Sequence, residues 1–80
     1  MTIHLTNDSP EEWGGSFALA VAALVDDILT DESPFDATIM FDDGVERFER
    51  TGSVSRRESG YVVIDGNLLS EANIIGIHIP

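Results

Sequence analysis

The sequence predicts an α+β fold in which one helix packs on a curled antiparallel sheet of four to five strands, in the order β-α-β-β-β-β. Three observations predict it. A helix-start signal precedes a helical stripe of apolar residues in the first half of the chain, two turn signals containing Asp-Gly divide the second half, and alternating isoleucines end it. No repeat or linker interrupts residues 1–80, which we take as one domain. The alternative is that the same elements form a partly closed small barrel.

The first two elements are a strand and the helix. Residues 2–6 alternate polar side chains with Ile3 and Leu5, as in a half-buried strand. Ser9-Pro10-Glu11-Glu12 then gives a capping hydroxyl, a proline suited to the first helical position and a glutamate three residues after the cap. Apolar residues follow at helical spacing and predict a stripe that faces the sheet: Trp13, Phe17, Val21, Leu24 and Ile28.

Glycines and small residues mark the rest of this helix. Gly14 and Gly15 each cost about 1 kcal/mol relative to alanine within a helix, so either the helix restarts near Ser16 or another backbone approaches there. Away from the stripe lie Gly15, Leu19 and Ala22, followed by Ala23 and Asp26. This set either belongs to a well-buried, alanine-rich helix or forms a face for a partner or a second copy, so a homodimer stays open.

A β-hairpin follows the break at Ser33-Pro34. Residues 37–41 and 45–51 read as its strands around Asp42-Asp43-Gly44. With Asp43 and Gly44 as a two-residue loop, Ile39 is expected opposite Phe48, and Met40 opposite Arg47. Residues 52–60 are polar and predict a loop or a bent strand, whose Arg56 and Arg57 we expect to pair with Glu58 or with the acidic face.

Two more strands complete the expected sheet. Residues 61–64 are β-rich and stop at Asp65-Gly66-Asn67. Ile75, Ile77 and Ile79 are then expected on one face of a last strand. His4 and His78 are expected on the faces opposite to the apolar residues, where they can be neighbours across the sheet. Two imidazoles are fewer than the three or four ligands of a zinc site, and cysteine is absent, so no metal site and no cofactor is predicted.

The stretch from Ala37 to Ile79 resembles the strand-rich part of a small Sm-like or SH3-like barrel. The likeness rests on the acidic hairpin turn, the glycine-bounded bend at residues 52–60 and the terminal isoleucine strand. It covers about half of the chain and implies a small closed barrel. It does not include the residues with which such barrels hold RNA bases and phosphates, and the acidic hairpin argues against RNA binding on that side.

Charge is segregated along the chain. Every charged residue among the first 46 is acidic, whereas four arginines and four acids cancel in the remaining 34, and the net charge is -11. Carboxylates two apart on a strand lie about 6.6 Å apart, comparable with phosphates along a nucleic-acid strand. We therefore expect the acids to gather on one partner-binding patch, whose residues are Asp26, Asp27, Asp31, Glu32, Asp36, Asp42, Asp43 and Glu46.

This charge excludes some partners and favours others. A field of one sign repels nucleic acid and anionic membranes and attracts basic surfaces. The longest apolar run, residues 17–25, is short of the ~20 residues that cross a bilayer. Acids stand where a signal peptide needs basic residues, so we expect the protein in the cytoplasm, and in the host cytoplasm if it is phage-encoded. Exposed hairpin carboxylates lack the burial and the cleft of a catalytic pair, so no enzyme is predicted.

Together these features predict a non-enzymatic acidic protein that blocks a basic, nucleic-acid-binding protein by presenting a phosphate-like carboxylate array. Small phage-encoded inhibitors of CRISPR or restriction defence are similar in size and charge. Two alternatives stay open. One is an immunity or adaptor protein that binds one basic protein, and the other is a salt-adapted structural or Sm-like small-barrel subunit whose acids serve solubility.

Overall fold

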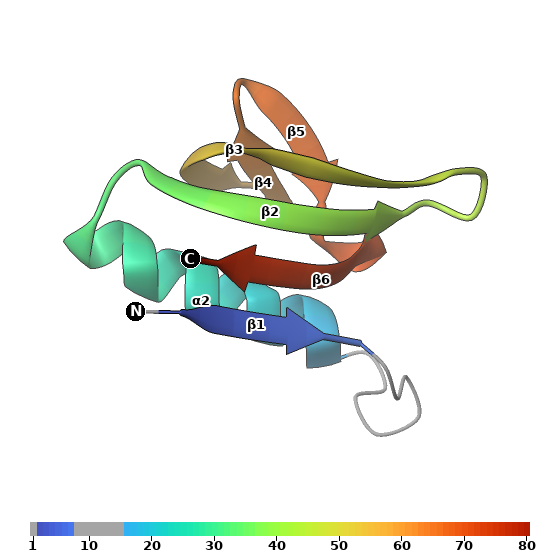
Figure 1. Ribbon diagram of the computed structural model, residues 1–80, viewed down its shortest axis with the longest axis horizontal. Coiled ribbons are helices and arrows are strands. Elements are labelled where there is room, and N and C mark those ends of the chain that lie inside the picture. The colour runs from blue at the N-terminus through green and yellow to red at the C-terminus, as the bar shows by residue number, and fades with distance from the viewer. Residues whose placement is uncertain (1, 8–15) are drawn as a thin grey trace.

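A six-stranded antiparallel sheet with one helix packed against it makes up the part of the computed structural model that is described, residues 2–7 and 16–80 (Figure 1). The strand order is β1-β6-β2-β3-β4-β5. The predicted α+β class is confirmed. In chain order the elements are β1 (Ile3–Thr6), α2 (Ser16–Asp31), β2 (Phe35–Asp42), β3 (Arg47–Glu58), β4 (Tyr61–Ile64), β5 (Asn67–Ser70), the 3₁₀ turn η1 (Glu71–Asn73) and β6 (Ile74–Ile79).

The sheet curls but does not close. β1 and β5 are its two edges and do not pair with each other. The alternative of a partly closed barrel is therefore wrong, and so is the barrel implied by the resemblance to Sm-like and SH3-like proteins. The sheet also contains a strand that was not predicted, β5. This strand is only four residues long and follows directly on the turn at Asp65-Gly66, and its Leu68 and Leu69 do not alternate with polar residues.

Helix α2 covers one face of the sheet and packs against β3, β6 and η1. Its buried side chains are Phe17, Val21, Val25 and Ile28, which recur at steps of three and four and join the core formed by the inner faces of the strands. Leu24, predicted on this stripe, is only partly buried at its border. The predicted helix start at Ser9 and the predicted stripe residue Trp13 lie outside the described residues. Within the described ranges no helix is long and apolar enough to cross a bilayer.

The β2–β3 hairpin forms as predicted, but in a different register. Phe41 lies opposite Phe48, and Asp42 lies opposite Arg47, so four residues rather than two connect the strands. The reason is the Asp43 side chain, whose Oδ1 accepts hydrogen bonds from the Val45 and Glu46 backbone N–H groups, both 2.9 Å long. These bonds satisfy the backbone of a wider loop than a two-residue turn provides.

Residues 52–60, expected to form a loop or a bent strand, contain the bent end of strand β3. β3 runs on to Glu58, and its pairing with β4 shifts between Val54 and Arg56, where a β-bulge bends it and curls the sheet. Gly52 lies just before this bend, with the Asp65 carboxylate against its Cα. That carboxylate accepts a 3.0 Å hydrogen bond from the Ser53 N–H. A side chain at position 52 would displace it, so glycine is required there for close approach.

A second irregularity changes which isoleucines of β6 are in the core. The register against β2 shifts where Phe41 pairs with Ile74 and Met40 pairs with Gly76. Ile74 is thereby buried with Ile77 and Ile79, and the predicted face of Ile75, Ile77 and Ile79 is wrong at its first member. Half-buried Ile75 instead lines a hollow of about 310 Å³, together with Met40, Arg47, Phe48 and Glu49.

Candidate partner-binding surface

The eight acids predicted to form one patch lie in three places. Asp26, Asp27, Asp31 and Glu32 are at the carboxyl end of α2, Asp36 begins β2, and Asp42, Asp43 and Glu46 are at the hairpin tip. Figure 1 shows the end of α2 and the hairpin tip at opposite ends of the molecule. Asp36 and Asp42 are six residues apart on β2, about 20 Å at 3.3 Å per residue. Screening at physiological salt acts over about 8 Å, so the two ends behave as separate charges.

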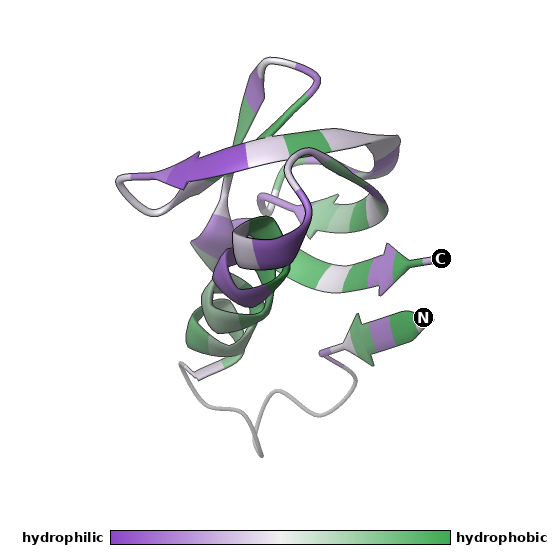
Figure 2. Cartoon of the chain, turned by 90° about the vertical axis from the view of Figure 1, so that its left-hand side faces the viewer, coloured by the Kyte–Doolittle hydropathy of each residue, from purple (hydrophilic) through white to green (hydrophobic). Residues whose placement is uncertain are grey.

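The carboxyl end of α2 holds a dense group of carboxylates that have no ion pair among residues 2–7 and 16–80. Asp27, Asp31 and Glu32 are exposed, and none forms an ion pair in the part of the chain that the structure describes. The last turn contains no basic residue, although cations are favoured at this end of the helix dipole. Figure 2 shows this polar end of α2, in purple, next to the turn into β2. We call Asp27, Asp31 and Glu32 the helix-end cluster.

Asp26 differs from its neighbours because Arg57 binds it. The Arg57 Nη1 donates a 2.6 Å hydrogen bond to Asp26 Oδ2, and the same guanidinium binds both carboxylate oxygens of Glu71. Glu71 is buried, and its carboxylate raises the pKa of the Arg57 guanidinium well above its ordinary value. This bridge joins α2, β3 and η1. Sequence reasoning suggested that Arg57 meets the acidic face but gave no signal for Glu71.

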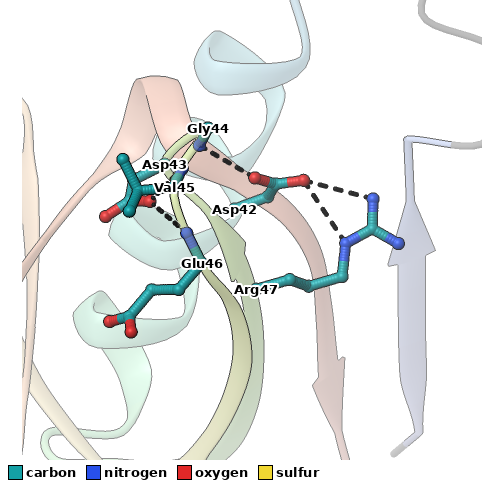
Figure 3. Close-up of polar contacts among 6 residues, drawn as sticks. All are labelled: Asp42, Asp43, Gly44, Val45, Glu46 and Arg47. Atoms are coloured by element: carbon teal, nitrogen blue, oxygen red, sulfur yellow. Dashed lines mark hydrogen bonds and ion pairs between the residues drawn. The ribbon is translucent and has the colours of Figure 1, made fainter.

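The hairpin acids hold their own loop together (Figure 3). Asp42 Oδ1 accepts a 2.9 Å bond from the Gly44 N–H, and Asp42 Oδ2 binds the Arg47 guanidinium at 3.2 and 3.3 Å. Asp43 binds the backbone of Val45 and Glu46 as described above. Of the three predicted residues here, only Glu46 has a carboxylate with no hydrogen bond or ion pair among the described residues. The tip is therefore acidic, but most of its carboxylates serve the turn.

The hairpin carboxylates make the turn sensitive to acid. Hydrogen bonds from the Glu46 and Val45 N–H groups hold the pKa of Asp43 below its ordinary value, and bonds from the Gly44 N–H and Arg47 do the same for Asp42. A carboxyl group whose pKa is lower in the folded state than in the unfolded state stabilises the fold. This contribution is complete above the unfolded-state pKa, about 3.9, and is lost as the pH falls through the folded-state pKa.

We therefore expect the amide proton shifts of Val45 and Glu46 to move together, with a midpoint below about pH 3.9. NMR titration measures this. In Asp43→Asn the side chain keeps an acceptor oxygen but cannot titrate, so this step should disappear from both amides. Amide shifts that stay constant down to about pH 2 in the unchanged protein would contradict the loop geometry.

Three of the four arginines form ion pairs within the described structure. Arg47 pairs with Asp42, Arg56 with Glu58 at 2.7 Å, and Arg57 with Glu71 and Asp26. Arg50 lies over the Phe48 ring, 5.9 Å from its centroid. The expected pairing of Arg56 with Glu58 is confirmed. Arg50 has no ion pair, and its Nε is buried without a hydrogen-bond partner among the described residues. Since carboxylates outnumber arginines in the described residues, the excess charge there is anionic.

The predicted partner or oligomer face lies on the exposed side of α2. Leu19 is 71% exposed and Ala22 is half-buried, while Gly15 lies outside the described residues. The alternative of a helix buried all round is therefore wrong. Leu19, Ala23, Asp27 and Asp31 follow one another at four-residue steps, so one exposed stripe passes from apolar residues into the helix-end cluster.

The remaining candidate ligands of the described chain are its two histidines. His4 and His78 are neighbours across β1 and β6, as predicted. Among the described residues, no three His, Cys, Asp or Glu side chains are grouped so that they could together hold a metal ion. No protein-family model matches the chain, and neither a curated protein nor a solved structure shows significant similarity to it.

Proposed function

We propose that the protein is a non-enzymatic, cytoplasmic inhibitor that binds a basic, nucleic-acid-binding protein through the helix-end cluster and occupies the place of phosphates there. The observation that carries this proposal is the group of exposed carboxylates in the helix-end cluster, none of which forms an ion pair among the described residues. These acids stand where the helix dipole disfavours them. A locally unfavourable arrangement of this kind is typical of a functional surface.

The spacing of the helix-end cluster supports the proposal. No strand of the described structure carries acids two residues apart. Asp27 and Asp31 are one turn apart on α2, with Cβ atoms about 5–6 Å from each other. The helix thus supplies the phosphate-like spacing that was expected from a strand. Exposed Leu19 and Ala23 on the same stripe add apolar contact area beside the charge.

Charge reversal at the helix end tests this function. We expect Asp27→Lys/Asp31→Lys to weaken binding of the target about 100-fold or more, because like charges then face each other in the interface. The same substitutions should leave the fold intact or raise its stability by about 0.3–1 kcal/mol each, since lysine suits the carboxyl end of a helix. Asp26 is left unchanged because it binds Arg57.

The matched control is Glu46→Lys/Glu49→Lys, which makes the same charge change at two exposed acids that form no ion pair in residues 2–7 and 16–80. The immobilised chain is incubated with lysate at low salt and eluted between about 0.1 and 0.5 M salt, where exposed charge pairs are screened. The unchanged protein and the control should release the same nucleic-acid-binding protein, and excess double-stranded DNA should displace it. Equal loss in both variants would contradict the helix-end site.

The same experiment separates the alternatives. A captured protein that DNA does not displace would indicate the immunity or adaptor function. If nothing is captured specifically, the salt-adapted structural function is favoured instead, in which the acids serve solubility.

A further inference from the structure

The two histidines of the chain form a close pair on the open face of the sheet, away from α2. His4 in β1 lies directly opposite His78 in β6, and their Nδ1 atoms are 3.1 Å apart. The ring centroids are 5.3 Å apart. His4 is exposed and His78 is half-buried, so both rings are accessible. The residues are 74 positions apart in the chain, and only the folded sheet brings them together.

The contact between the two rings requires that one of the two Nδ1 atoms carries no proton. Only one of the two Nδ1 atoms can donate, so the other must present a lone pair and its ring must be neutral. A neutral imidazole is also the form that binds metal ions. A transition metal that replaces the shared proton would gain two nitrogen ligands at once.

The spacing fits such an ion. Imidazole nitrogens bind divalent transition metals at about 2.0–2.1 Å, so two nitrogens 3.1 Å apart subtend roughly 100° at the metal. This angle lies between those of square-planar and tetrahedral coordination. We propose that His4 and His78 form a two-imidazole chelate for a late first-row divalent metal ion, Cu²⁺ most strongly, with water or an external donor at the remaining positions.

The surroundings determine which ions bind. The site offers nitrogen donors and, among the described residues, no grouped third side-chain ligand, so Ca²⁺ and Mg²⁺, which need several oxygens, are not bound there. Affinity should instead follow the order in which Cu²⁺ exceeds Ni²⁺ and Zn²⁺. The negative charge of the chain raises the concentration of any divalent cation near the surface. The chelate would fasten the four-residue edge strand β1 to β6, and it is independent of the proposed inhibitor function.

Electron paramagnetic resonance with one equivalent of Cu²⁺ tests the site directly. We expect splitting from two nitrogens in the unchanged protein. Cu²⁺ at about ten times its dissociation constant should also raise the thermal midpoint by roughly 5–10 °C, since the chelate exists only in the folded state. Removing either ring, by His4→Ala or His78→Ala, should lower Cu²⁺ affinity about 100-fold, because the two ligands then no longer act together.

The controls separate this site from other copper ligands. Asp27→Asn/Asp31→Asn removes exposed carboxylates and should change Cu²⁺ affinity by less than about two-fold if the imidazoles hold the ion. His4→Asn and His78→Asn serve as second variants if an alanine variant does not fold. Loss of the two-nitrogen spectrum in both single variants supports the chelate. Two results would overturn the chelate. One is retention of the two-nitrogen spectrum in His78→Ala, which would assign the second nitrogen to the amino-terminal amine. The other is a spectrum from a single nitrogen in the unchanged protein.

Discussion

Arg57→Met is expected to destabilise the protein by about 3 kcal/mol and to lower its thermal midpoint by roughly 15 °C. The substitution keeps the aliphatic stem but removes the guanidinium that binds Glu71 and Asp26. The Glu71 side chain is only 9% exposed, so its carboxylate would be left without a cation in a poorly solvated place. Removing one partner of such a pair costs more than the pair itself contributes. Urea denaturation monitored by circular dichroism measures the effect.

Arg56→Met is the matched control, one residue away on the same strand. Its partner Glu58 is 49% exposed and Arg56 is 60% exposed, so the loss should be below about 1 kcal/mol. A double variant, Arg57→Met/Glu71→Met, should recover most of the stability, because it removes the unpaired charge as well. If Arg57→Met and Arg56→Met cost the same, the bridge between α2, β3 and η1 does not hold the fold together.

Ile74→Ala is expected to cost about 3 kcal/mol, and Ile75→Ala only about 1 kcal/mol. Ile74 is 2% exposed and belongs to the core, whereas Ile75 is half-buried beside the hollow near Met40 and Phe48. The substitutions remove the same atoms from adjacent residues of one strand, so the difference reports which side chain the bulge directs into the core. Chemical denaturation of both variants measures it.

The alternation of the sequence predicts the reverse order, with Ile75 in the core beside Ile77 and Ile79. A larger loss for Ile75→Ala than for Ile74→Ala would therefore show that β6 runs without the shift in register. Ile77→Ala is a useful reference, because Ile77 is fully buried in the structure and also lies on the core face that the alternation predicts. The substitution should therefore cost about 2–5 kcal/mol in either register.

The sequence predicted those features that depend on neighbouring residues. Apolar spacing gave the helix and its buried Phe17, Val21 and Ile28, and Asp-Gly turns gave the hairpin and the end of β4. The pairing of Arg56 with Glu58, two residues away, was also predictable. Such features follow from local periodicity and turn chemistry, which a few consecutive residues determine.

The acidic site was predictable in composition but not in arrangement. The sequence shows which residues carry charge, and the helix end was recognisable from acids where the dipole prefers cations. It does not show that Asp26 is bound by Arg57, 31 residues away, or that the hairpin acids bind their own loop. One continuous array was expected, and the strand β2 separates its members instead, because a strand extends by about 3.3 Å per residue.

The sequence by itself determined an α+β domain with one amphipathic helix, its turns and its excess of acid, since each depends on short-range spacing or on composition. Only the tertiary structure decided the open sheet, the bulges that choose Ile74 and bend β3, the bridge through Arg57 and the contact of His4 with His78. These depend on which strands pair and in what register. Register is settled by packing of the whole core, and a shift of one residue turns every side chain of a strand to the other face.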